Sequence, residues 1–330
     1  MQIGFCNSGC AIGAKWSTLY TEIPKAESTG YFELRPKSMV THITHDEKGR
    51  VNGVLYRDSD GVLRQQLARA VCVAGNAIET ARLLLNSHSA MFPGGLGNGS
   101  DQVGRNYMTH FTILVISEMP GEVNFHRGTQ QAGTIRDEHR NDVSRGFVGG
   151  YSINTVPFGP VNIVRFVNPG GWGHEVASVV DKYSKLAGMM MIGEDLPQAT
   201  NRISLDATAT DAYGQPLAHV HYRDHSNTKK MKQHAWRQGR AIHRSVGAVK
   251  VFETGEALPA THNLGTARMS SNAADGVCNH WGQSHEIPNL YISDGSLFST
   301  SGCANPTLTI VALAIRQAEH IAKEIAAKRF

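Results

Sequence analysis

One stretch of the chain, residues 261–315, constrains the fold more than any other. Residues 289–293 have the apolar composition of a strand, and the polar residues 294–296, Asp-Gly-Ser, predict a sharp turn with exposed backbone N–H groups. Asn305 stands where a helix N-cap is expected, and Pro306 suits the first helical position. The apolar residues that recur on one face of the long helix after it are Leu308, Ala312, Ile315 and Ile325.

The N-terminus of this helix is the chemical focus of the stretch. Its free N–H groups and its dipole form a site for negative charge, which suits a phosphate or an electron-rich ring. His262 carries an imidazole that titrates close to neutral pH, and it is near enough in sequence to fold back against the helix. These features together predict a redox cofactor with a base nearby.

These residues closely resemble the carboxy-terminal signature of the glucose-methanol-choline (GMC) oxidoreductases, which are FAD enzymes that oxidise alcohol groups. The resemblance implies that His262 is the general base and that Asn305 holds the substrate oxygen, a place where the family has histidine or asparagine. From the residues alone, Asn305 could instead be only the helix N-cap.

The same resemblance implies a set of cofactor contacts in this region. Asp294 and Gly295 would contact the phosphate and ribityl part of FAD, although a carboxylate that only stabilises the turn is the alternative for Asp294. The helix that begins at Pro306 and Thr307 would direct its positive end at the flavin ring, where negative charge appears on reduction.

A second part of the chain, residues 31–75, reads as a series of strands separated by turns, a β-meander that leads into a buried strand at 70–74. Gly75 then opens a helix, and strand, glycine and helix in that order are typical of dinucleotide folds. This segment resembles the second GMC signature. By that resemblance, Ala74 and Gly75 flank the adenosine of FAD, and the backbone of Val40 meets the adenine.

Residues between these parts are expected to form a substrate lobe. Residues 103–110 resemble the family segment that crosses toward this lobe, and His110 within it is interpreted as a hydrogen-bonded structural histidine. The sequence from His110 to residue 193 is strand-like and rich in glycine. A hairpin that turns at 211–214 and an amphipathic helix over 227–246 follow.

Metal sites are not favoured by the histidines and cysteines. His219, His221 and His225 invite a zinc hypothesis, but no ligand completes a recognised spacing, so satisfied or surface histidines are the preferred interpretation. Cys6 and Cys10 supply only half a ligand set. We therefore predict no metal.

Composition excludes several classes of protein. The formal net charge of +4 is mild and no run of basic residues appears, which argues against a nucleic-acid partner. No apolar run approaches the ~20 residues that span a bilayer. Five cysteines at irregular spacing argue against a disulfide framework and favour a reducing compartment, unless a targeting signal precedes Met1.

The expected fold is α/β (α+β): a partial FAD/NAD(P)-binding Rossmann-like lobe and a GMC-type substrate lobe with an antiparallel sheet. The predicted domains are residues 1–97 and 258–330 for the FAD lobe and 98–257 for the substrate lobe. No G-x-G-x-x-G follows a strand, and the family carries that loop near its amino terminus, so the chain is expected to correspond to the later part of a complete enzyme.

The function implied is FAD-dependent oxidation of an alcohol, sugar or polyol, with a quinone or cytochrome as the favoured electron acceptor. The main alternative is a truncated, non-catalytic remnant or scaffold that does not hold FAD. A nicotinamide dehydrogenase ranks last, because it would need the same glycine-rich loop.

Overall fold

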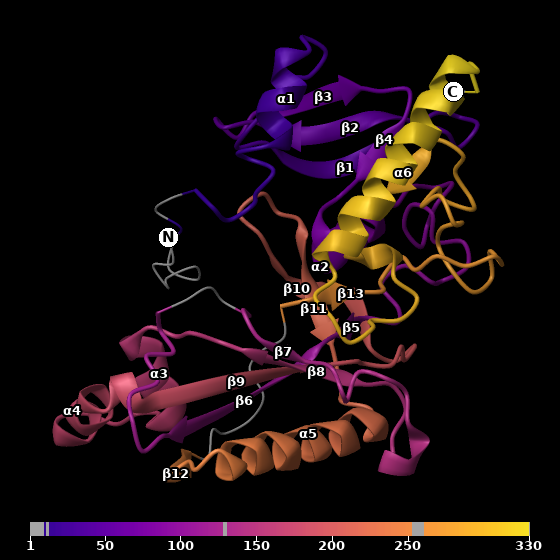
Figure 1. Cartoon of the computed structure of the whole chain (residues 1–330). Coiled ribbons are helices and arrows are strands. Elements are labelled where there is room, and N and C mark those ends of the chain that lie inside the picture. The colour runs from indigo at the N-terminus through magenta and orange to yellow at the C-terminus, as the bar shows by residue number, and fades with distance from the viewer. Residues whose placement is uncertain (1–9, 11–12, 128–130, 253–260, 330) are drawn as a thin grey trace. The chain divides into compact units, whose positions relative to one another are not determined.

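The computed structural model describes residues 10, 13–127, 131–252 and 261–329, and it is drawn in Figure 1. The chain divides into two compact units. The first contains the described residues of Met1–Leu34, Phe111–Gly193 and Asn227–Pro259; the second contains Arg35–His110, Glu194–Ser226 and Ala260–Phe330. The fold is mixed helix and sheet, as expected, and the predicted domain bounds stay a prediction.

The first unit is built on a five-stranded antiparallel sheet. Its order is β12-β6-β9-β8-β7. The strands are β12 (Lys250–Phe252), β6 (Phe111–Glu118), β9 (Leu186–Gly193), β8 (Tyr151–Thr155) and β7 (Thr134–Ile135). The long pair β6–β9 runs in unbroken register from Phe111 opposite Gly193 to Glu118 opposite Leu186.

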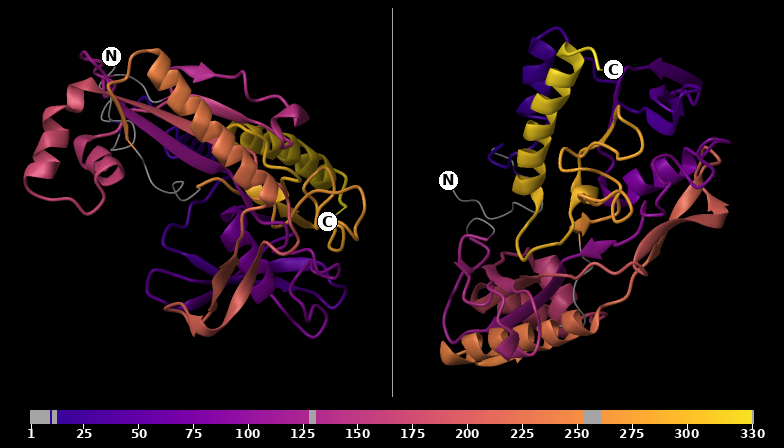
Figure 2. Two further views of the ribbon diagram at one scale, coloured as in Figure 1. Left: turned by 90° about the horizontal axis from the view of Figure 1, so that it is seen from below. Right: turned by 90° about the vertical axis from the view of Figure 1, so that its right-hand side faces the viewer.

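Helix α5 (Ser226–Ser245) lies along this sheet, as both views of Figure 2 show. Met231 and Ala235 of the helix are fully buried in one cluster with the sheet side chains of β6, β8 and β9. Gly239 lets the helix approach closely, since a Cβ there would lie 2.9 Å from Val115 and from Met191. The amphipathic helix expected over 227–246 is therefore confirmed within one residue at each end.

Short helices complete the first unit. They are α1 (Glu22–Ser28), α3 (Pro160–Val167), α4 (His174–Asp181) and the 3-10 turns η2 (Val143–Arg145) and η3 (Tyr183–Lys185). The strand-like interpretation of residues 111–193 was wrong for α3 and α4. Ile163 of α3 and Val179 of α4 are buried together with Ile116 and Leu186, so tertiary packing overrides the β-branched composition of α3.

The second unit begins with the expected meander. Strands β1 (Met39–His45), β2 (Val51–Arg57) and β3 (Leu63–Leu67) pair antiparallel in that order. The turn between β1 and β2 is fixed by Asp46, whose Oδ1 accepts from the backbone N–H groups of Lys48 and Arg50 at 2.9 Å each. The meander prediction is thus confirmed.

A parallel pair of short strands follows. β14 (Leu290–Ile292) pairs with β4 (Val71–Val73), and α2 (Asn76–Asn86) starts directly after β4. Val73 is buried, but Cys72 is exposed, so β4 is not covered on both faces by the residues that the structure describes.

Asn289, just before β14, ties the parallel pair to the meander. Its Oδ1 accepts from the N–H of Val51 at 3.1 Å, and its Nδ2 donates to the carbonyls of Val51 and Arg69, both at 2.7 Å. The side chain is 2% exposed. One amide therefore bonds to three backbone groups.

Three further pieces complete the second unit before its last helix. The expected hairpin is present as β10 (Arg202–Thr210) and β11 (Pro216–His221). The short strands β5 (Met108–Thr109) and β13 (Asn263–Leu264) pair antiparallel, and the 3-10 turn η4 (Gly295–Leu297) follows β14.

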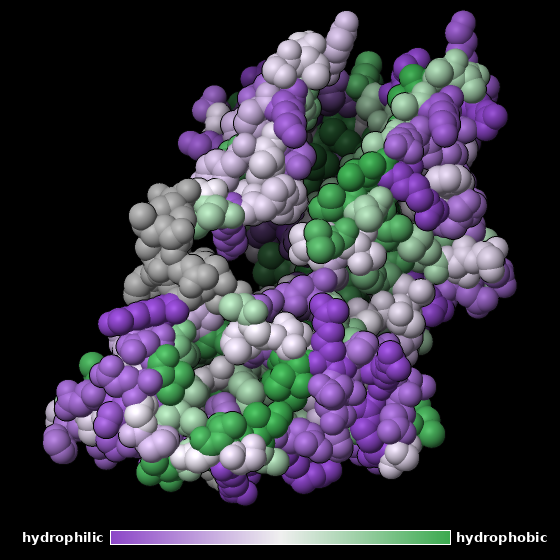
Figure 3. Space-filling view, in the orientation of Figure 1, coloured by the Kyte–Doolittle hydropathy of each residue, from purple (hydrophilic) through white to green (hydrophobic). Residues whose placement is uncertain are grey.

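Helix α6 (Thr307–Ala326) is held at its middle by a polar residue. Gln317 is 4% exposed, and its Nε2 donates to the carbonyls of Trp281 at 2.9 Å and Ile292 at 2.7 Å. Leu308 and Ile315, expected on a packed face, are 85% and 59% exposed. Figure 3 shows hydrophobic surface over this helix.

Within the described residues, no helix combines the length and the apolar character needed to cross a bilayer.

Candidate active site

The carboxyl ends of the two parallel strands lie at one edge. Tyr291 is opposite Cys72 and Ile292 is opposite Val73, and the N–H of Ser293 donates to the carbonyl of Val73 at 2.7 Å. Ala74 and Gly75 leave one strand there, and Asp294 and Gly295 leave the other. Ligands of open α/β folds bind outside the carboxyl ends of parallel strands. Four of the predicted cofactor residues are thus neighbours.

A hydroxyl relay joins these two strand ends. Thr80 of α2 is fully buried, and its Oγ1 accepts from the N–H of Gly75 at 3.0 Å and donates to Oδ2 of Asp294. The other carboxylate oxygen, Oδ1, accepts from the N–H of Ser296 at 2.7 Å and also from its hydroxyl. Asp294 therefore stabilises the turn, which is the alternative that the sequence left open; contact with a cofactor stays a prediction for it.

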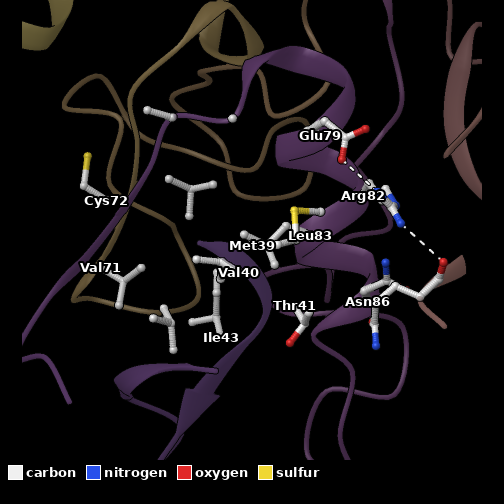
Figure 4. A pocket seen from close by; sticks show the side chains of 15 residues that line it. Met39, Val40, Thr41, Ile43, Val71, Cys72, Glu79, Arg82, Leu83 and Asn86 are labelled. Carbon is white, nitrogen blue, oxygen red and sulfur yellow. Dashed lines mark hydrogen bonds and ion pairs between the residues drawn. The ribbon is translucent and has the colours of Figure 1, made fainter. Parts of the chain in front are cut away.

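A cavity of about 510 Å³ opens beside this edge, and Figure 4 shows it at close range. Val40 of β1, Ala74 and Gly75 line it together with apolar side chains. The apolar residues that line it include Met39, Ile43, Val54, Val71, Val73 and Leu83. Its size is that of a small-molecule site, and its walls suit a flat apolar ring such as an adenine.

An ion-paired arginine borders the cavity. Arg82 of α2 pairs with Asp211 through Nη2 at 2.6 Å and with Glu79 through Nη1 at 3.1 Å, and its Nε donates to the carbonyl of Pro216 at 2.7 Å. Figure 4 shows it beside Glu79. Arg82 was missed by the sequence analysis, although a single arginine among the apolar residues of this helix was the available signal.

His262 and His110 lie next to each other in another part of the second unit. Asn263 of β13 is opposite Thr109 of β5, so the register brings the preceding His262 to the following His110. The two Nδ1 atoms are 2.8 Å apart, and the rings meet edge to face at a centroid distance of 4.9 Å. The interpretation of His110 as a hydrogen-bonded residue is confirmed, but its partner was not foreseen.

His110 is also bonded on its far side. Its Nε2 lies 3.0 Å from the carbonyl oxygen of Ser301 and 2.9 Å from that of Gly302. Ser301 is itself held, because its Oγ accepts from the N–H of Asp195 at 2.8 Å and donates to the Asp195 carbonyl at 3.0 Å. His110 thus joins His262 to the segment that leads to α6.

Both imidazoles favour their neutral form. Burial lowers the pKa of His110. Burial, and after it the neighbouring His110, lowers the pKa of His262 to about 4. His262 is only partly buried, so at neutral pH it is an uncharged imidazole within reach of solvent or a ligand.

Asn305 lies in a hollow of about 420 Å³ formed by the segment before α6. Its side chain is exposed, and it is not the helix N-cap: the helix begins at Thr307 with Pro306 in the N-cap position and no capping side chain. Pro306 is therefore one position outside the helix. The first N–H groups of α6 have no partner within the helix.

The structure places the predicted residues in four places. Val40, Ala74 and Gly75 share the cavity; Asp294 and Gly295 lie at the adjoining strand end; and Asn305, Pro306 and Thr307 form the start of α6. His262 stands with His110. No hydrogen bond between described residues joins His262 directly to Asn305.

The cysteine and histidine motifs form no metal cluster within the described residues. The rings of His219 and His221 stack at a centroid distance of 4.2 Å on β11. Cys6 lies outside the described residues.

Comparison with known proteins identifies the family to which the chain belongs. Two family models described as GMC oxidoreductase match the chain. The amino-terminal model matches residues 1–112, and the carboxy-terminal model matches residues 197–314. The chain is 32% identical to 2-methyl-1,2-propanediol dehydrogenase of Mycolicibacterium austroafricanum over 96% of its length and 59% of that protein. It is 28% identical to the fructose dehydrogenase large subunit of Gluconobacter japonicus, over 97% of the chain and 59% of the relative.

A solved structure of formate oxidase matches with a TM-score of 0.62 at 14% identity, over 87% of this chain and 60% of the other. The chain thus spans about three fifths of the length of the proteins it matches. Two models of one family match the chain in order and the fold agrees with a GMC structural neighbour; the chain therefore belongs to the GMC oxidoreductase family.

Proposed function

We propose that this chain forms a large part of an FAD-dependent enzyme that oxidises the CH–OH group of a sugar or polyol. The observation that carries the proposal is the neutral His262, paired with His110 through Nδ1 and joined by it to the segment that precedes α6. The names of the two similar proteins support the substrate class, since 2-methyl-1,2-propanediol and fructose each carry more than one hydroxyl group.

The residues that would hold FAD lie at the strand ends and at α6. The cavity lined by Val40, Ala74 and Gly75 has the size and apolar walls for the adenine end. Gly295 and the start of α6 at Pro306 and Thr307 would face the remainder, where the positive end of a 20-residue helix favours negative charge. When bound, FAD supplies the acceptor for the hydride.

The chain's own residues would manage the proton and the oxygen. His262 takes the proton of the substrate hydroxyl, which a neutral imidazole can accept. The exposed amide of Asn305 donates a hydrogen bond to the same oxygen as it gains alkoxide character. An acceptor other than oxygen, such as a quinone or cytochrome, completes the proposal, and both of the similar proteins compared above are named dehydrogenases.

His262→Ala tests the base. We expect flavin content to be unchanged and kcat to fall by ~10²–10⁴-fold, the usual contribution of general base catalysis. The measurement is steady-state oxidation of a polyol panel, with flavin content read from the visible spectrum. His285→Ala is a matched control, because His285 is a partly buried histidine of the same unit whose Nε2 lies 3.0 Å from the Ser270 carbonyl. Unchanged turnover in His262→Ala refutes the assignment.

Asn305→Ala tests the oxygen-binding amide. Since Asn305 makes no capping bond to α6, the melting temperature should stay the same while kcat falls. Loss of about 1 kcal/mol of stability with unchanged kcat would instead favour a cap.

Flavin retention separates an enzyme from a non-catalytic scaffold. A preparation that binds FAD but oxidises no alcohol, or that binds none when FAD is supplied, favours the scaffold.

A further inference from the structure

We propose that His110 is a positioning residue that holds His262 in the tautomer with its proton on Nδ1, so that Nε2 carries the lone pair that accepts the substrate proton. The catalytic meaning of this inference rests on the function proposed above.

Nε2 of His110 carries a proton. This nitrogen faces two carbonyl oxygens, those of Ser301 and Gly302, at 3.0 and 2.9 Å. A carbonyl oxygen has no proton to donate, so Nε2 must be the N–H donor. The carbonyls are fixed in place because the Ser301 hydroxyl bonds to both the N–H and the carbonyl of Asp195.

The ring of His110 carries no second proton. His110 is 0% exposed, and the neutral form of a buried imidazole is favoured over the charged one. Among the described residues, no carboxylate forms an ion pair with either ring: Asp195 Oδ2 is occupied by the hydroxyl of Tyr222 at 3.0 Å. A neutral His110 with its proton on Nε2 has an unprotonated Nδ1.

The unprotonated Nδ1 of His110 determines which nitrogen of His262 carries the proton. The two Nδ1 atoms are 2.8 Å apart, which is a hydrogen-bond distance, and one of them must donate. Since Nδ1 of His110 can only accept, Nδ1 of His262 carries the proton. Its other nitrogen, Nε2, then holds the lone pair, and it has no hydrogen-bond partner within the described part of the chain.

The strand register makes this arrangement rigid. Both histidines flank the β5–β13 pair, where Leu264 is opposite Met108 and Asn263 is opposite Thr109. Neighbouring bonds reinforce the pair, since the hydroxyl of Tyr107 donates to Oδ1 of Asn263 at 2.5 Å. The imidazole pair thus sits on backbone that is already paired, as a preorganised base requires.

The tautomer can be read directly by ¹⁵N NMR of histidine-labelled chain at neutral pH. We expect a pattern with the proton on Nδ1 for His262 and on Nε2 for His110, with assignments taken from His262→Gln and His110→Gln spectra. A proton on Nε2 of His262, or an imidazolium at His110, overturns the proposal, and this reading needs no activity and no bound flavin.

Variants at position 110 test the cause. His110→Phe removes the acceptor and should let His262 exchange between tautomers, whereas His110→Gln keeps an amide donor and acceptor and should restore part of the Nδ1–H population. His45→Phe is the control: His45 is also bonded through both nitrogens, to the Asp46 carbonyl and to Ser89, each at 2.8 Å. An unchanged His262 tautomer in His110→Phe refutes the positioning role.

In a preparation that oxidises a polyol, His110→Phe should lower kcat at least ~10-fold with little change in KM, toward the ~10⁴-fold loss seen when a catalytic imidazole is held in the wrong tautomer. His110→Gln should recover part of the loss. If the wild-type protein oxidises no alcohol while the tautomer pattern is as expected, the proposed function fails and the hydrogen-bond assignment stands. A tautomer shift in His110→Phe without loss of kcat refutes the catalytic part.

Discussion

Replacing Thr80 by valine removes the hydroxyl that joins the two strand ends of the candidate site. Valine has nearly the same shape, so the change leaves no cavity and isolates the hydrogen bonds. Two bonds are lost: the one donated to the buried carboxylate of Asp294 and the one accepted from the N–H of Gly75. A bond to a charged group contributes about 1.5–3 kcal/mol and a neutral one about 0.5–1.5 kcal/mol, so we expect a loss of ~2–4 kcal/mol.

The assay is urea-induced unfolding, combined with hydrogen exchange of the amides in β4 and β14 to locate the loss. Both strands end at this relay, so their exchange should rise more than that of the β10–β11 hairpin. Flavin retention should fall in parallel if the strand ends hold the cofactor.

Thr80→Ser is the matched control. It keeps the hydroxyl and removes one methyl group, which costs ~1 kcal/mol in a buried site. The reasoning is refuted if Thr80→Val loses no more stability than Thr80→Ser.

Two other changes test the packing of each unit. Asn289→Ala should lower the free energy of unfolding by ~3–5 kcal/mol, because two buried backbone groups of Val51 and the part-buried carbonyl of Arg69 lose their partner; the exposed Asn272→Ala should change it by less than ~0.5 kcal/mol in the same urea titration. Burial lowers the pKa of His243, bonded to the Ser117 hydroxyl at 2.6 Å, to about 4, so its contribution is complete above pH ~6.5 and is lost as the pH falls toward 4. The melting temperature of His243→Gln should therefore decrease less steeply with falling pH in that window than that of the wild type. Equal slopes would contradict the burial argument.

Local signals sufficed for the elements with strong turn and helix chemistry. The Asp-Gly-Ser turn at 294–296, the strand–glycine–helix order at Gly75 and the helix after Pro306 were all predicted, because each is specified by residues adjacent in sequence. The amphipathic period of α5 gave its bounds within one residue for the same reason.

Contacts between distant segments could not be predicted in that way. His110 meets His262 across 152 positions, through a strand pair of only two residues on each side. No periodicity marks so short a pair, and the bond from Thr80 to Asp294 spans 214 positions. Helices α3 and α4 were missed because packing around Ile163 decides their conformation.

The anchoring of α6 by Gln317 gives the helix the mechanics of a lever. The side-chain amide of Gln317 fixes helix α6 about ten residues from its exposed beginning at Thr307, a length of ~15 Å at 1.5 Å per residue. A tilt of about 4° around that point displaces the beginning of the helix by ~1 Å, and a misplacement of that size in a catalytic site can lower the rate by ~10²-fold. A side chain bonded to the end of β14 thus helps to fix the direction in which the positive end of the helix points.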